Sequence, residues 1–207
     1  CESSNFLLMN QTFYIKGVAV TDNTFPYKTG QTTSYATDDD GDIEFGRGSS
    51  WTTLDADNPH GNTTRFLDEL GGTSFAAGIL VDWAHADYVN ELVLMWSTSH
   101  NGSDINWATA LSDVAASTLG GFSDWVLPNI QVMRTIENQS TSRGLNYVPF
   151  SEAGNVRFWT STTWNGATSY ALALANRPVE LSGVTKTTSA NLRHYQVRVA
   201  TFAEAGI

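Results

Sequence analysis

The chain has 207 residues, a formal net charge of −10 and one cysteine. Charged residues make up only 15% of the chain, against about 25% in an ordinary soluble domain, and Thr, Ser and Asn supply the polarity instead. Aromatic residues reach 12%, which argues against intrinsic disorder, and 11 dispersed Lys and Arg residues argue against nucleic-acid binding. The single cysteine excludes a disulfide within the chain and a cysteine-based zinc cage.

The first residues predict a processed start followed by an extended segment. Cys1 resembles the acylated cysteine at which a bacterial lipoprotein signal is cut, and the alternative is that the sequence simply begins there. An apolar run follows, formed by Phe6, Leu7, Leu8 and Met9. The run is too short to span a membrane, and no other stretch is long enough. We expect it to pack within its own domain or on a neighbouring copy, so residues 1–27 are an assembly strand or an anchor.

The densest group of carboxylates lies in a predicted turn. Asp38, Asp40 and Asp42 alternate with other residues, and oxygen-rich turns of this kind can hold Ca²⁺. The spacing does not match an EF-hand, because Ile43 stands where the loop needs Gly and Ser49 where it needs Glu. A calcium site and a solvated acidic turn therefore both remain open.

Two segments have helical periodicity. In the first, apolar residues recur from Trp107 to Leu119, with Asp104 and Asn106 as candidate N-caps and Gly120-Gly121 as the stop. The second begins after Pro128-Asn129 and places three apolar residues on one face: Ile130, Met133 and Ile136.

Strand patterns follow the helices at residues 156–162, 169–174, 180–181 and 195–202. Two short helices packed on antiparallel strands indicate an α+β fold for residues 28–207, taken as one domain.

No catalytic constellation is recognisable. The four histidines lie far apart in the sequence, and neither a Gly-x-Ser-x-Gly turn nor a glycine-rich phosphate loop occurs. We therefore expect a non-catalytic protein.

Two of the seven tryptophans are candidates for sugar binding. Trp51 and Trp164 lie among Ser, Thr, Asn and Gly, so we expect them to be exposed, where an indole face suits the C–H face of a sugar. The alternative for any tryptophan is core packing. Core packing is the prediction for the four in apolar patterns: Trp96, Trp107, Trp125 and Trp159.

Several segments together carry a resemblance to one bacterial family. The most specific is residues 120–128, Gly-Gly-Phe-Ser-Asp-Trp-Val-Leu-Pro. Others occur in the same order as in the family, at residues 29–32, 39–41, 65–66, 92–96, 106–111, 158–163, 186 and 197–199. Over residues 28–202 the chain resembles the C-terminal domain of the Legionella collagen-like protein. It departs from the family pattern at Val126, where arginine is usual.

The resemblance implies a C-type-lectin-like fold in a secreted or surface protein, and it does not imply calcium-dependent sugar binding. The leading expectation is a self-assembling extracellular subunit, a homo-oligomer or polymer in a filament or surface array, whose N-terminal run packs on a neighbour. The alternative is a monomeric adhesin or lipoprotein that binds polysaccharide, the role the family implies. No cofactor is expected apart from the calcium considered above.

Overall fold

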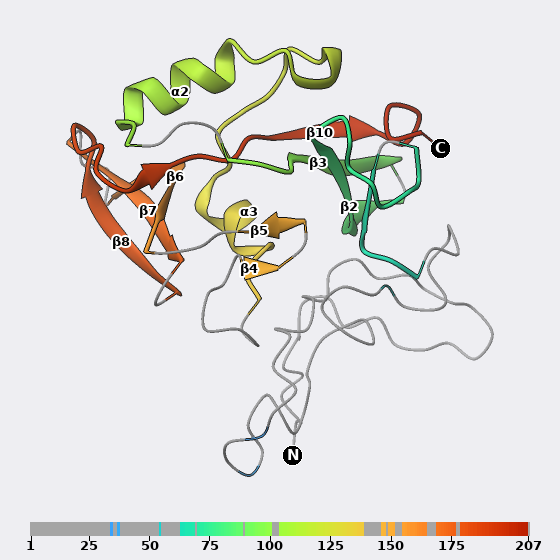
Figure 1. The fold of residues 1–207 in the computed structure, drawn as a ribbon, viewed down its shortest axis with the longest axis horizontal. Helices are drawn as coiled ribbons and strands as arrows, with labels where there is room; N and C mark the ends of the chain where they lie inside the picture. The colour runs from blue at the N-terminus through green and yellow to red at the C-terminus, as the bar shows by residue number, and fades with distance from the viewer. Residues whose placement is uncertain are drawn as a thin grey trace, which may run out of the picture.

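The computed structural model describes Ser34, Thr37, Leu54 and residues 63–68, 70–88, 90–100, 104–138, 146–147, 149–151, 155–164, 169–176 and 179–206. These residues form a mixed α+β structure with two four-stranded sheets, in which most strand pairs are antiparallel, and two α-helices (Figure 1). The predicted α+β class is therefore confirmed.

The first sheet has the order β1-β2-β3-β10, and all its neighbouring strands are antiparallel. Its strands are β1 (Phe66–Leu67), β2 (Ile79–Asp87), β3 (Leu92–Ser97) and β10 (Val197–Thr201). The last strand of the chain thus lies beside β3, with Val197 opposite Trp96. The predicted closing strand, 195–202, is shorter in the structure.

The second sheet has the order β8-β7-β6-β9, with only β6 and β9 parallel. Its strands are β6 (Arg157–Thr163), β7 (Tyr170–Asn176), β8 (Val179–Thr185) and β9 (Leu192–Arg193). A separate pair joins β4 (Asn146–Tyr147) to β5 (Phe150–Ser151). The prediction for 180–181 was too short, because β8 pairs with β7 along seven residues.

Both predicted helices are present. The helix α2 (Trp107–Ala115) begins at Asn106, whose side chain accepts a hydrogen bond from the Thr109 N–H at 2.9 Å. The other candidate cap, Asp104, instead accepts from the backbone N–H of Asn191. After α2 a separate 3-10 turn, η1 (Leu119–Gly121), replaces the predicted continuation to Leu119. Among the described residues no helix is long and apolar enough to cross a membrane.

The second helix, α3 (Ile130–Arg134), is capped by Asn129, and its predicted apolar face is buried. The two helices cover opposite faces of the second sheet. Ala110 and Val114 of α2 pack with Trp159 on one face, and Met133 of α3 packs with Phe158 on the other. Figure 1 shows α2 above this sheet and α3 towards the centre of the molecule.

Gly120 is needed in η1 for two reasons. Its φ of 65° lies in the left-handed region, and a Cβ there would overlap Ile79 Cδ1. We expect Gly120→Ala to lower the free energy of unfolding by about 2 kcal/mol, because the backbone penalty is about 1–2 kcal/mol and Ile79 must also rotate. Gly71→Ala is the control, since Gly71 has a φ of 77° and open space. Equal losses in urea titrations would contradict a contribution from Ile79.

Candidate functional site: an aromatic platform on the second sheet

One exposed feature of the second sheet is an indole ring that lies over a neighbouring strand. Trp164 follows β6, and its ring reaches over to Gly183 in β8. A Cβ at Gly183 would lie 2.8 Å from Trp164 Cδ2 and 2.9 Å from Cε3, so a side chain there would displace the ring. Trp164 is 40% exposed, which leaves part of the indole accessible.

Two more large apolar side chains share the face that carries Trp164. Antiparallel pairing sets Leu172 opposite Gly183 and Leu174 opposite Leu181, and side chains alternate between faces along each strand. Tyr170, two residues before Leu172, therefore belongs to the same face. Tyr170 is 44% exposed and Leu181 is 41% exposed. We call Trp164, Tyr170, Leu181 and Gly183 the aromatic platform.

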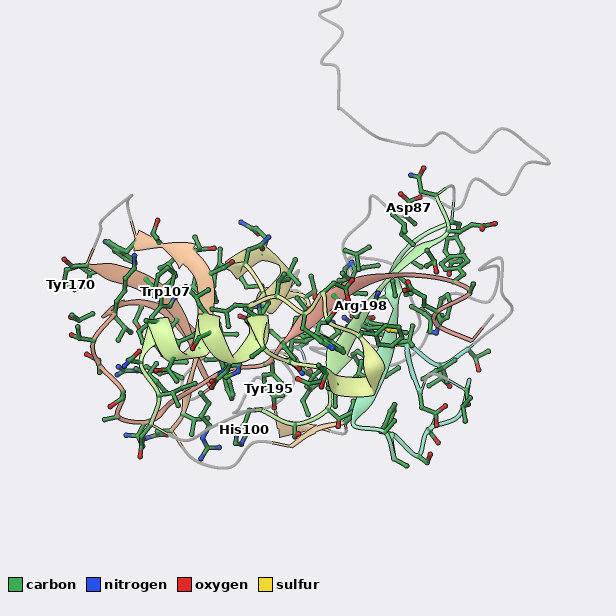
Figure 2. The ribbon with its side chains drawn as sticks, turned by 90° about the horizontal axis from the view of Figure 1, so that it is seen from above. Asp87, His100, Trp107, Tyr170, Tyr195 and Arg198 are labelled. Atoms are coloured by element: carbon green, nitrogen blue, oxygen red, sulfur yellow. The ribbon has the colours of Figure 1, made fainter. Side chains whose placement is uncertain are left out.

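The platform lies at the outer end of the second sheet. Figure 2 shows Tyr170 at one end of the molecule, on the side of Trp107 and far from Asp87 and Arg198. A flat aromatic surface held against a strand can stack on an apolar face of a ligand with little loss of side-chain freedom, because its ring is already immobilised.

The structure describes only some of the site residues that the sequence predicts. Trp164 is exposed, as predicted, whereas the partner expected from the sequence, Trp51, lies outside the described residues. The other candidates also lie outside them: Cys1, Phe6, Leu7, Leu8, Met9, Asp38, Asp40 and Asp42. Within the described ranges, no group of three His, Cys, Asp or Glu side chains could hold a metal ion. Calcium binding by the acidic turn stays a prediction.

The four tryptophans expected in the core lie largely as predicted. Trp96, Trp125 and Trp159 are buried. Trp107 is only half-buried: its indole N–H donates to the Thr160 carbonyl at 2.8 Å, and the Lys186 ammonium lies 4.1 Å from its ring centroid.

Sequence reasoning missed the residues that accompany Trp164. The alternation Tyr-Ala-Leu-Ala-Leu from Tyr170 to Leu174 is a signal that Tyr170 shares a face with the leucines. No comparable signal marks Gly183, because its contact with Trp164 depends on β6 and β8 lying on either side of β7.

The most specific sequence segment has a structural role in the first sheet. Asp124 accepts two hydrogen bonds from the Arg198 guanidinium, at 2.7 and 3.0 Å, and Arg198 lies 4.0 Å from the ring centroid of Phe122. A third hydrogen bond joins Arg198 to Glu204 at 2.9 Å. The hydrogen bond from Arg198 lowers the pKa of the Asp124 carboxyl below its ordinary value, despite partial burial. The segment therefore docks residues 122–124 on β10.

A buried ion pair joins β2 to the residue before β1. Arg65 donates from Nε and Nη2 to the two carboxylate oxygens of Asp82, both at 2.7 Å, and Nη2 also donates to the Thr135 carbonyl. Burial alone would raise the pKa of Asp82, but the charge and hydrogen bonds of Arg65 overcome this effect and hold the pKa below its ordinary value. Both side chains are fully buried, so the pair has a structural role.

One histidine is buried without a polar partner. His194 is fully buried, and neither ring nitrogen has a hydrogen-bond partner among the described residues. Burial, assisted by the nearby His100, lowers its pKa to about 4, although the charge of Asp113 acts in the opposite direction. His194 is therefore neutral at pH 7.

Comparison with known proteins identifies the family. No curated protein matches the chain significantly. The family model described as the Lcl C-terminal domain matches residues 88–199, more than half of the chain. The match spans β3 to β9 and most of β10, and it includes the Asp124–Arg198 contact and the aromatic platform. The chain therefore belongs to the Lcl C-terminal domain family.

Proposed function

We propose that this chain is a non-catalytic bacterial surface protein that binds polysaccharide through the aromatic platform. The observation that carries the proposal is the indole of Trp164, partly exposed and seated on Gly183 beside the exposed Tyr170. An aromatic ring on a rigid strand offers a sugar a flat apolar surface without first having to be ordered. The low charge of the chain and its high Thr, Ser and Asn content support an extracellular location.

A C-type-lectin-like fold is part of the same proposal. Membership of the family supports it, as do two short helices packed on antiparallel strands and a closing strand that returns to the middle of the chain at β3. This fold does not require a calcium ion at the sugar site, and the platform contains no carboxylate.

Trp164→Ala is expected to reduce glycan binding at least about tenfold, because it removes the indole on which a sugar would stack. A glycan array would identify ligands of the native chain, and titration calorimetry with the best one would then compare variants. Gly183→Ala is expected to weaken binding too, because the added methyl displaces the indole while Trp164 stays in the chain.

Val199→Ala is the matched control, because Val199 is an exposed apolar strand residue of the other sheet. Native binding by Val199→Ala together with loss in Trp164→Ala supports the platform. An array on which the native chain binds nothing, or Trp164→Ala with native affinity, contradicts the proposal.

A second candidate function is self-assembly, favoured by the outer edge of β8, beside which no strand lies in the described part of the chain. The sequence assigns an assembly role to Phe6–Met9 as well, and that role stays a prediction. Deleting residues 1–15 would test it by electron microscopy and light scattering. Assembly that persists unchanged after the deletion would contradict an assembly role for the N-terminal segment.

A further inference from the structure

The outer edge of β8 presents backbone groups that pair with no strand in the described part of the chain. The Lys186 N–H donates to the Ser169 carbonyl at 2.9 Å, which sets the alternation of hydrogen bonds between β7 and β8. Leu181 and Gly183 therefore turn their N–H and C=O groups away from β7. No strand described in the structure lies on that side.

The middle of this edge lacks the residues that usually discourage strand pairing. Natural edge strands are commonly protected by charged residues, prolines or bulges. From Leu181 to Thr185 the strand has neither a charged residue nor a proline, although Glu180 lies near its start and Pro178 precedes it. The register between β7 and β8 is continuous, and Leu181 exposes an apolar side chain beside the edge.

A buried hydroxyl on the same strand lacks a partner. Ser182 Oγ is buried and has no hydrogen-bond partner among the described residues. The backbone of Ser182 forms its hydrogen bonds with β7. Towards the outer side of β8, Ser182 is therefore at a non-hydrogen-bonded position, where paired antiparallel strands bring opposite Cα atoms to about 4.5 Å. Serine pairs across such positions can form a hydrogen bond.

We propose that β8 is a self-association surface, on which a second copy of this chain pairs its own β8 antiparallel about Ser182. The two four-stranded sheets then form one continuous sheet across a two-fold axis. In this register each Ser182 faces the Ser182 of the second copy and gains a hydrogen-bond partner.

The side chains at this edge are complementary in the same register. Leu181 of one copy lies opposite Gly183 of the other, which has no side chain of its own and is covered by Trp164. Leu181 therefore packs against the edge of the indole, and the two-fold axis repeats the contact. Apolar surface of Leu181 and of the edge of the indole is covered in both copies.

The β8 pairing is a specific form of the self-assembly proposed as the second candidate function, and it rests on that proposal. It also places two aromatic platforms on one face of the joined sheet, where a polysaccharide chain can contact both and bind with higher effective affinity. Because a two-fold contact closes on itself, a filament requires a second interface besides β8.

A crosslinking experiment tests both the contact and its register. In a Cys1→Ser background, Ser182→Cys is expected to form a disulfide-linked dimer under mild oxidation, because Cα atoms about 4.5 Å apart suit a disulfide. Thr185→Cys in the same background is the control, since Thr185 does not face its own copy in this register. Analytical ultracentrifugation of the full-length chain is expected to show a dimer.

Leu181→Lys is expected to raise the dimer dissociation constant at least about tenfold, since it places a charge on the edge of each strand. Val199→Lys, on the other sheet, is expected to leave the constant unchanged. A monomeric native chain overturns both the pairing and self-assembly. An assembled chain whose Ser182→Cys variant does not crosslink, or whose assembly survives Leu181→Lys, overturns the β8 pairing alone. Loss of the dimer when residues 1–15 are deleted assigns the contact to the N-terminal segment and also overturns the β8 pairing.

Discussion

Asp82→Asn is expected to lower the free energy of unfolding by about 3–5 kcal/mol, the usual cost of leaving one member of a buried ion pair without its partner. The Arg65 guanidinium is fully buried, and Asp82 provides the charge that offsets its desolvation. Asparagine keeps the size of the side chain and one acceptor oxygen. The loss of unfolding free energy therefore measures the effect of the missing charge rather than that of a cavity.

Urea titration monitored by tryptophan fluorescence would measure the change, with a shifted midpoint and an unchanged slope. The double variant Arg65→Met/Asp82→Leu is expected to recover most of the loss, because apolar residues of similar size can replace a buried pair at little cost. Asp124→Asn is the control, since its carboxylate pairs with Arg198 but is more than half exposed. An Asp82→Asn loss no larger than that of Asp124→Asn would contradict the argument.

The sequence predicts local structure best where a pattern repeats within one element. Apolar residues at helical spacing located α2 and α3, and Asn106 capped α2 as expected because a cap acts only on the next turn. The end of α2 was placed too late. Leu119 continues the apolar periodicity, but it belongs to η1 and packs with the core of the first sheet, which the spacing alone does not reveal.

Contacts between distant segments were not predictable from the sequence. Arg65 and Asp82 are 17 residues apart, and a buried ion pair leaves no periodic signal that separates it from two surface charges. The aromatic platform shows the same limit. The polar surroundings of Trp164 indicated exposure, yet its seat on Gly183 depends on how β6, β7 and β8 are ordered in the sheet.

The buried His194 is expected to make the protein less stable in mild acid. The unfolded chain binds a proton at this histidine below about pH 6.5, whereas the folded protein does so only near pH 4. The contribution is therefore complete above pH 6.5 and is lost as the pH falls towards 4. The total loss is on the order of 3 kcal/mol, of which about 2 kcal/mol is lost by pH 5.

Urea titrations at pH 7.5 and pH 5 would measure this loss separately from the carboxylates. The lowered pKa values of Asp68, Asp82, Asp124 and Glu204 act in the same direction but at lower pH, since the ordinary values of these groups are already 4.5 or below. His194→Leu is expected to abolish most of the difference between the two pH values. It also removes two buried nitrogens without partners among the described residues, so the variant should be at least as stable at pH 7.5.

His100→Gln is the matched control, because it removes the imidazole ring whose charge acts on His194 and leaves His194 buried. Since the charge of His100 helps to lower the pKa of His194, this variant is expected to keep most of the pH dependence, with a slightly smaller change of unfolding free energy per pH unit. A His194→Leu variant with the native pH dependence would show that another group takes up the proton on unfolding. A neutral, buried histidine thus makes a protein proposed to work outside the cell lose stability at a higher pH than the range in which its carboxylates titrate.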